Sequence, residues 1–273
     1  MAGYDDLLPP CRGPSMMSKL AALLLALSVW LPAQAQPLRV CTNEWPPYTL
    51  LEDGQVRGID ADLLTLALDN LGIAHEMTLE PWRRCLRKMQ DGQLDILLDA
   101  FYNEERARQM RFPSEPMAEN AMVLFYATAR PHKVDSVAEL TGLRVGTEPG
   151  YAYGDASFAE GTHFIREDAP SLEANFGKLL LGRVDLVITD RAVGLYTARL
   201  LGMQEAIDYN RKPLYSDRVY AAFSRKPDVA ALVPRFEAEL KRIKAGPDYA
   251  RILQRYHQPV AESTAGQTET SAD

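Results

Sequence analysis

Arg106 is the side chain in this sequence best suited to bind a small carboxylate. It ends the run Asn103-Glu104-Glu105-Arg106. A planar guanidinium can hold a carboxylate through two charge-assisted hydrogen bonds. The alternative is an arginine in an exposed loop, because several other arginines are nearby: Arg83, Arg84, Arg108 and Arg111.

Two aspartates stand where predicted strands end. Asp190 follows the apolar residues Leu186-Val187-Ile188 and Thr189, and an aspartate there can cap the next helix without any ligand. Asp99 follows a similar apolar run and precedes Ala100-Phe101-Tyr102. Asp99 could bind a cationic group or could simply end its strand.

The remaining residues argue against a metal, a nucleotide or a nucleic acid as ligand. The spacing of His and Cys matches no zinc site, so we expect no metal and no cofactor. The loop Gly150–Gly154 lacks the glycine spacing and the lysine of nucleotide-phosphate motifs. The 273 residues carry 30 Lys and Arg against 37 Asp and Glu, a net charge of −7. Nucleic-acid binding needs a basic face, so this balance argues against it.

The N-terminal segment has the pattern of a cleaved secretion signal. An apolar run, Leu20–Leu31, follows Lys19 and precedes Ala33-Gln34-Ala35. The run is too short to span a membrane, which takes about 20 apolar residues. We therefore predict a leader over residues 1–35, with cleavage near Ala35 and export to the periplasm. Translation from Met16 or Met17 would give this leader a better start than the first methionine does.

Two cysteines, Cys41 and Cys85, remain once Cys11 has left with the leader. An even pair in an oxidising compartment predicts a disulfide, worth about 4 kcal/mol in the chain-entropy model. Two buried free thiols are the alternative.

Two short motifs recur in the same order along the chain. Leu38–Thr42 resembles Leu143–Thr147, and Gly92–Leu98 resembles Gly182–Ile188. The first motif is typical of a strand rising to a loop, and the second of a helix end followed by a strand buried on both faces. The repeat predicts an α/β fold with two lobes, each a mostly parallel sheet flanked by helices.

Apolar periodicity places helices between these strands. Asp60 is expected to cap a helix that ends at Gly72, and Ala192–Leu201 forms another after Asp190. Two late helices, around Leu232–Ile243 and Tyr249–Tyr256, are expected to return to the first lobe.

This return requires two crossings between the lobes. Phe125–Arg130 and Leu214–Ser224 have strand character and would form a hinge. The predicted boundaries are residues 37–128 and 217–258 for lobe 1 and 131–213 for lobe 2, with a disordered tail over 259–273.

Several motifs together resemble the family 3 extracellular solute-binding proteins, the periplasmic receptors of polar amino acid ABC importers. The segments that carry the resemblance are Gly58-Ile59-Asp60-Ala61-Asp62-Leu63, Glu44-Trp45-Pro46-Pro47-Tyr48, Asn103-Glu104-Glu105-Arg106 with Phe112-Pro113, and Gly246-Pro247-Asp248-Tyr249. The resemblance spans about residues 37 to 258 and implies a type II periplasmic-binding-protein-like fold. Ala61 and Leu68 depart from the usual residue sets.

The resemblance also implies a ligand site. Arg106 would hold the α-carboxylate and Asp190 the ammonium of the ligand, while Trp45 and Trp82 would sandwich its side chain. Packing beside Leu86 is the alternative for Trp82. The loop at Tyr151 would open a helix and give backbone N–H groups to the carboxylate. Tyr48 is a further candidate ligand residue, although its type and place are more typical of a packing residue.

Tyr151 and the segment from Asp99 to Tyr102 also depart from the family pattern. Tyr151 stands where relatives often carry Ser or Thr, and Asp99 to Tyr102 replace small hydroxyl residues. An acid and two large rings imply a ligand that differs in size or charge from a common polar amino acid.

The resemblance implies a monomeric binding protein, not an enzyme, that delivers an amino acid-like ligand to a membrane permease. One alternative is an enzyme like the cyclohexadienyl dehydratases on the same fold, with Glu44 or Glu148 in pocket-facing loops as acids. The histidines (His75, His132, His163, His257) lie outside the ligand motifs. Another alternative is a sensor module acting through a separate partner.

Overall fold

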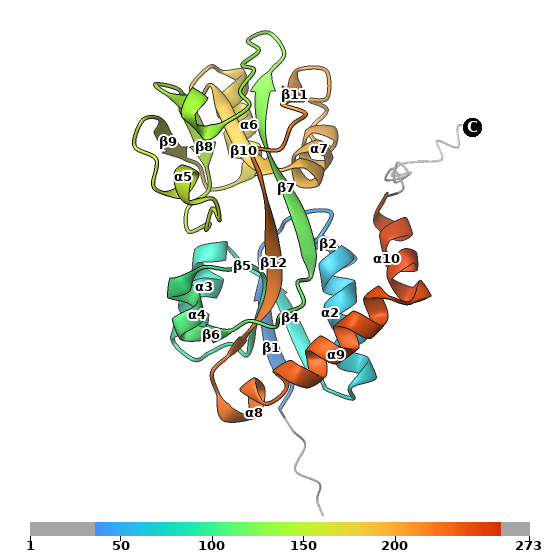
Figure 1. The fold of residues 1–273 in the computed structure, drawn as a ribbon. Coiled ribbons are helices and arrows are strands. Elements are labelled where there is room, and N and C mark those ends of the chain that lie inside the picture. The colour runs from blue at the N-terminus through green and yellow to red at the C-terminus, as the bar shows by residue number, and fades with distance from the viewer. Residues whose placement is uncertain (1–35, 258–273) are drawn as a thin grey trace, which may run out of the picture. The chain divides into compact units, whose positions relative to one another are not determined.

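The computed structural model describes residues 36–257, so the predicted leader and the predicted disordered tail lie outside the described residues. Residues from Pro37 onward form one unit in which two lobes are joined by two long strands, β7 (Ala118–Ala127) and β12 (Tyr215–Ser224) (Figure 1). The predicted hinge strand Leu214–Ser224 matches β12 closely. The other, predicted over Phe125–Arg130, overlaps only the end of β7, which begins at Ala118. The lobe boundaries drawn from the sequence stay predictions.

The first lobe, as the term is used below, contains the chain's early elements and its last three helices. Its strands are β1 (Leu38–Thr42), β2 (Leu50–Glu52), β3 (Gln55–Arg57), β4 (His75–Leu79), β5 (Ile96–Phe101) and β6 (Met110–Arg111). Its helices are α2 (Ile59–Asn70), α3 (Trp82–Gln90), α4 (Glu104–Gln109), α8 (Pro227–Ala230), α9 (Val233–Lys244) and α10 (Pro247–His257).

The second lobe contains the middle of the chain. Its strands are β8 (Arg144–Thr147), β9 (Ile165–Asp168), β10 (Leu186–Asp190) and β11 (Ile207–Tyr209). Its helices are the short 3₁₀ turn η1 (Val137–Leu140), α5 (Ala156–Ala159), α6 (Leu172–Leu180) and α7 (Arg191–Leu200). Among residues 36–257, no helix is both long and apolar enough to cross a membrane.

One sheet runs through both lobes in the order β4-β1-β5-β12-β7-β10-β8-β9. The strand pairs at each end are parallel: β1 with β4 and β5, and β8 with β9 and β10. The hinge strands pair antiparallel with each other and join the two parallel parts. All residues of β5 and β10 are buried, as expected for strands covered on both faces.

The sequence repeat is a structural repeat. In the first lobe, Arg39 at the start of β1 donates from its backbone N–H and from Nε to the Asp95 carboxylate, at 2.9 and 3.1 Å. In the second lobe, Arg144 on β8 makes the same two contacts with Asp185, at 2.8 and 3.1 Å. The aspartate that precedes each central strand is thus held by the arginine of the neighbouring strand. The prediction of a two-lobed α/β fold is confirmed.

Asp60 does not cap α2, contrary to the sequence prediction. The helix begins after Gly58, whose φ is 125°, and Asp60 lies fully buried in its first turn. The first N–H groups donate instead to main-chain carbonyls, from Ile59 to Pro47 at 2.9 Å and from Asp60 to Tyr48 at 3.0 Å. This close approach requires glycine at position 58, because a Cβ there would lie 2.1 Å from the Tyr48 carbonyl oxygen.

The predicted disulfide is present and links β1 to α3. Cys41 and Cys85 are both fully buried. Because Trp82 begins α3, the bridge fixes the helix that carries one of the predicted ligand residues. The C-terminal helix also contacts the first lobe, where the Tyr256 hydroxyl donates to Asp62 at 2.7 Å and accepts from the Gly58 N–H at 3.0 Å.

Candidate functional site

Three cavities are lined by residues of both lobes. The third, of about 210 Å³, is lined by Arg106, Gly150 and Tyr151 among others; the other two share several residues and are called the inner and the outer cavity below. The inner cavity has a volume of about 10 Å³. It is lined by Asn43, Trp45, Trp82, Asp99, Phe101, Arg106, Tyr151 and Ala152. Five of the seven predicted ligand residues line it together, whereas Tyr48 and Asp190 do not. Asn43, Phe101 and Ala152 were not singled out as ligand residues from the sequence.

Arg106 is a buried cation whose hydrogen-bond acceptors are carbonyl groups. Asn103 caps α4 by accepting from the Arg106 N–H at 2.7 Å, which fixes the helix that presents the guanidinium. The guanidinium donates to the carbonyls of Phe101 and Gly150, at 2.8 and 2.9 Å, and lies over the Trp82 ring, 5.4 Å from its centroid.

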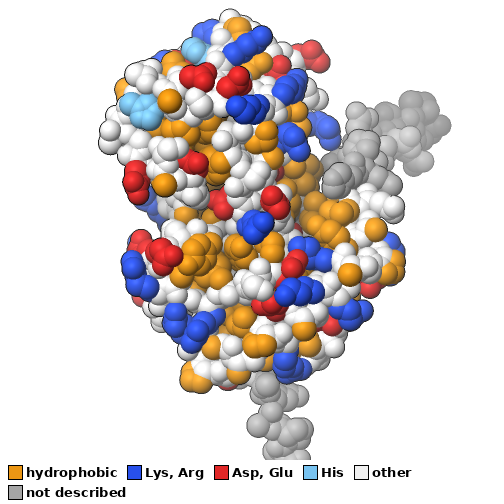
Figure 2. All heavy atoms as spheres, in the orientation of Figure 1, with side chains coloured by type: hydrophobic (Ala, Val, Ile, Leu, Met, Phe, Trp, Pro, Cys, Tyr) orange, Lys and Arg blue, Asp and Glu red, His pale blue; other side chains and the backbone are white. Residues whose placement is uncertain are grey.

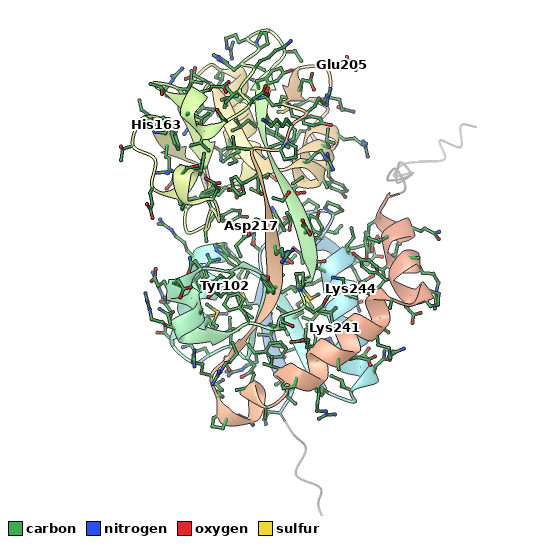
Figure 3. The ribbon with its side chains drawn as sticks, viewed as in Figure 1. Tyr102, His163, Glu205, Asp217, Lys241 and Lys244 are labelled. Atoms are coloured by element: carbon green, nitrogen blue, oxygen red, sulfur yellow. A yellow bond between two sulfur atoms is a disulfide. The ribbon has the colours of Figure 1, made fainter. Side chains whose placement is uncertain are left out.

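Arg106 has no salt-bridge partner within residues 36–257, although it is only 7% exposed. Burial lowers the pKa of its guanidinium to about 10, while the charges of Glu105 and Asp217 act in the opposite direction. Asp217 lies on β12 between the lobes (Figure 3). A buried guanidinium that lacks a carboxylate partner is a suitable site for an anionic group.

Side chains of the first lobe contact the Gly150 loop of the second lobe across this cavity. Trp82 Nε1 donates to the Gly150 carbonyl at 3.1 Å, and Asn43 Nδ2 donates to the Tyr151 hydroxyl at 2.8 Å. The rings of Trp82 and Tyr151 meet edge to face at 6.2 Å. The loop thus presents a carbonyl group to Arg106. Donation of its N–H groups to a ligand carboxylate stays a prediction. The inner cavity has room for about one water molecule, so a ligand that enters it requires these contacts to separate.

Asp190 is the N-cap of α7, which is the alternative that the sequence left open. Its carboxylate accepts from the N–H groups of Ala192 and Val193 at 2.8 and 3.1 Å. The hydroxyl of Tyr48 donates to the same oxygen at 3.4 Å from the first lobe. Burial is the largest cause that raises the pKa of both Tyr48 and Asp190. A contact between Asp190 and a ligand ammonium stays a prediction.

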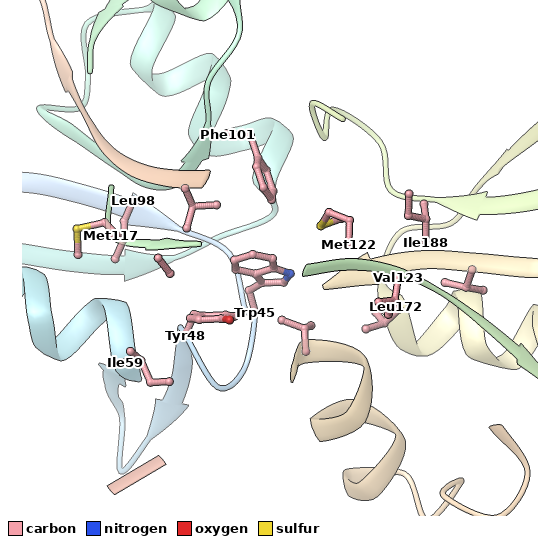
Figure 4. Packing of buried hydrophobic residues seen from close by; sticks show 14 of the residues in the cluster. Trp45, Tyr48, Ile59, Leu98, Phe101, Met117, Met122, Val123, Leu172 and Ile188 are labelled. Atoms are coloured by element: carbon pink, nitrogen blue, oxygen red, sulfur yellow. The ribbon is translucent and has the colours of Figure 1, made fainter. Parts of the chain in front are cut away.

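Trp45 occupies the junction between the lobes, where its ring stacks near Tyr48 and meets the edge of Phe101 at 4.9 and 5.9 Å. Figure 4 shows its indole nitrogen directed toward the Met122 side, away from the first-lobe core. This nitrogen is buried and has no hydrogen-bond partner among the described residues. A ligand acceptor between the lobes would satisfy it.

Asp99 and Asp60 form a buried carboxyl pair behind this aromatic layer. Asp99 has a left-handed backbone with φ of 60°, and its Oδ2 accepts from the hydroxyls of Thr42 and Thr49 at 3.1 and 3.2 Å. Burial raises the pKa of Asp99 to about 6. Burial and the neighbouring charge of Asp99 raise the pKa of Asp60 well above its ordinary range. Two buried carboxyls in contact cannot both ionise readily, so the pair holds a proton near neutral pH.

The substitution Asp99→Asn should therefore raise the free energy of unfolding at pH 8 by about 2–3 kcal/mol, since each pKa unit corresponds to about 1.4 kcal/mol. Asparagine tolerates a left-handed backbone and can accept the same threonine hydrogen bonds. The folded-state pKa lies above the ordinary 3.8, so the native protein gains stability as the pH falls through about 6 toward 4. The advantage of asparagine should shrink over that window.

Urea denaturation at pH 8 and pH 5 measures this difference, with the exposed Asp91→Asn as the matched control. A variant destabilised equally at both pH values would contradict the assignment of Asp99 as a group with a raised pKa.

The outer cavity is much larger, about 480 Å³, and shares Asn43, Trp45, Trp82 and Tyr151 with the inner one. Its charged lining residues are Glu44, Glu80, Glu148, Glu173 and Arg83. Both pocket-facing glutamates expected from the sequence, Glu44 and Glu148, are present there. Burial and the charge of Glu173 raise the pKa of Glu148 to about 7, and a hydrogen bond with Tyr151 acts against this shift.

Apolar side chains also reach the surface beside this junction. Figure 2 shows them gathered over the α3 and α4 part of the first lobe. There Phe112 meets the rings of Tyr102 and Tyr220 edge to face, at 5.2 and 5.6 Å. Tyr102 thus belongs to a surface aromatic cluster and does not line the inner cavity, unlike its neighbour Phe101. Within residues 36–257, no group of three or more His, Cys, Asp or Glu side chains could hold a metal ion.

The chain is similar to known binding proteins over most of its length. It is 25% identical over 229 residues to a probable histidine-binding protein of Neisseria gonorrhoeae, covering 80% of this chain and 82% of the relative. It is 22% identical over 245 residues to an arginine-binding periplasmic protein of Mannheimia haemolytica, covering 87% and 98%.

A solved structure shares the fold. An ancestral arginine-binding protein bound to arginine superposes with a TM-score of 0.70 at 22% identity, covering 82% of this chain and 99% of that chain. The sequence profile of the bacterial extracellular solute-binding proteins, family 3, matches residues 38–259. This match includes both lobes and the hinge strands between them. The chain therefore belongs to the bacterial extracellular solute-binding proteins of family 3.

Proposed function

We propose that this protein captures a free amino acid between its lobes in the periplasm and presents it to the permease of an ABC importer. The observation that carries the proposal is the buried guanidinium of Arg106, which has carbonyl acceptors but no carboxylate partner within residues 36–257. The α-carboxylate of an amino acid would replace the Gly150 carbonyl and form two charge-assisted hydrogen bonds.

The surroundings of Arg106 support an amino acid as the ligand. Trp45 and Trp82 both line the inner cavity and supply apolar surface there, and Asp190 would meet the ammonium once Tyr48 moves away from it. Two relatives are named for histidine and arginine binding, which agrees with a ligand of this class.

Hinge bending at β7 and β12 would admit the ligand. The contacts of Trp82 and Asn43 with the Gly150 loop would break on opening, and the lobes would close again around the bound molecule. Cleavage of the leader near Ala35 would release the protein into the periplasm, where we expect it to act as a monomer without a cofactor. A sensor role would use the same binding event through another partner.

We propose that the protein binds an amino acid and catalyses no reaction, and one experiment tests both claims. The exported protein is freed of ligand by unfolding and refolding, and its thermal midpoint is measured with each L-amino acid, and with prephenate and arogenate. A ligand present at 100 times its Kd should add about 2.7 kcal/mol to stability, which raises the midpoint clearly. A raised midpoint with an amino acid supports the proposal. Turnover of prephenate or arogenate would replace it with a dehydratase activity.

A further inference from the structure

We propose that the outer cavity holds a positively charged end of the ligand between Glu148 and Glu173. This inference rests on the proposed function and names the class of amino acid that the site accepts. The ligand would place its carboxylate at Arg106 and an ammonium or guanidinium group in the outer cavity.

The lining charges of the outer cavity favour a cation. Of its four glutamates, Glu80 is already neutralised by ion pairs with Arg84, at 3.1 Å, and with Lys88. Glu44, Glu148 and Glu173 have no salt-bridge partner within the part of the chain that the structure describes, and Arg83 is the single basic residue of the described lining. The lining thus carries more acidic than basic side chains.

Glu148 is held in place at the wall of this cavity. It directly follows β8, and its backbone N–H donates to the Tyr153 hydroxyl at 3.0 Å. Its carboxylate is destabilised by burial and by the negative charge of Glu173, which together raise its pKa to about 7. A cation between the two carboxylates would replace this repulsion by attraction and would favour the ionised form of Glu148.

The aromatic residues shared by both cavities suit a cationic side chain. Trp45 and Trp82 line the inner and the outer cavity, and indole faces attract ammonium and guanidinium groups. The charge of the lining differs between the two cavities: the inner cavity contains the cation Arg106, and the outer cavity contains the glutamates. The inner cavity, at about 10 Å³, leaves no room for a long side chain, whereas the outer one, at about 480 Å³, does.

Matched pairs of ligands test the inference. L-arginine and L-citrulline have nearly the same size, but citrulline carries a neutral urea group, and L-lysine and L-norleucine differ in the same way. Isothermal titration calorimetry should show at least about tenfold tighter binding of the cationic member in at least one pair.

Two variants then locate the cation. Glu148→Gln and Glu173→Gln should each reduce this preference by about threefold or more, mainly by weakening the binding of the cationic member. Glu160→Gln, at an exposed position outside both cavities, is the matched control. Because Glu173 is exposed at the start of α6, its variant should fold even if Glu148→Gln does not.

The outcomes separate this inference from the proposed function. Equal affinity within both pairs, or an unchanged preference in the folded glutamine variants, would overturn the cation site while amino acid binding stands. Failure of every amino acid to bind would overturn the proposed function itself.

Discussion

Replacing Arg106 by alanine should weaken amino acid binding by about 2–5 kcal/mol, the range measured when one partner of a buried charge pair is removed. The guanidinium is buried, and its position is fixed by the Asn103 cap and by the Phe101 carbonyl. Alanine would leave the ligand carboxylate without its cation at a buried position between the lobes. Isothermal titration calorimetry with the tightest amino acid measures the loss directly.

A neighbouring arginine provides the control for this prediction. Arg108 lies on the same short helix but is exposed, so Arg108→Ala should leave the affinity nearly unchanged. Arg106→Lys should fall between the two, because lysine keeps the charge but cannot form the two parallel hydrogen bonds. An Arg106→Ala variant within about threefold of the natural affinity would refute the role of this residue as carboxylate ligand.

Removing the disulfide should lower the free energy of unfolding by about 4 kcal/mol in the chain-entropy model, since the bridge closes a loop across a sequence separation of 44. The double variant Cys41→Ala/Cys85→Ala avoids a free thiol, and urea denaturation measures the change. Both sulfur atoms lie in the buried cluster of Trp82, Met89 and Leu94, so the loss of packing adds to the entropic effect.

A second measurement tests the bridge independently. A thiol count on the unfolded, unreduced exported protein should give no free thiol, whereas two free thiols would contradict the bridge. The denaturation midpoint of reduced natural protein should approach that of the double variant. Equal stability of the oxidised protein and the double variant would refute the predicted contribution.

The architecture could be predicted because it depends on local patterns that repeat. The two motif pairs each contain an arginine on the first strand and an aspartate before the central strand, and the structure joins them as Arg39 with Asp95 and Arg144 with Asp185. Strands buried on both faces give continuous apolar runs, and amphipathic helices give apolar stripes. Both patterns can be recognised in the sequence alone, because they do not depend on contacts between distant residues.

The predicted N-cap role of Asp60 was wrong because of main-chain groups that are distant in the sequence. Asp60 has the sequence context of an N-cap, but the carbonyls of Pro47 and Tyr48 already satisfy the first turn of α2. Asp60 consequently becomes a buried partner of Asp99, for which the sequence indicates either a cation ligand or the end of a strand. The role of Asp60 is therefore set by the loop that contains Pro47 and Tyr48, because its carbonyls accept the hydrogen bonds that a cap would otherwise accept.

The side-chain contacts between the two lobes also could not be predicted from the sequence. The departure at Tyr151 was visible, but its contact with Asn43 joins residues 108 positions apart. Likewise, the glutamates of the outer cavity come from four separate segments, and the sequence pointed to Glu44 and Glu148 without indicating Glu173. Residues from distant segments meet here because of how the lobes fold, and no spacing along the sequence indicates it.

A crystal structure of the protein with its tightest amino acid ligand would show whether Arg106 binds the ligand carboxylate. We expect a ligand between the lobes whose carboxylate accepts two hydrogen bonds from the Arg106 guanidinium, with the Gly150 carbonyl displaced from its present contact. A ligand bound elsewhere, or one that leaves the contact between Arg106 and Gly150 intact, would contradict it.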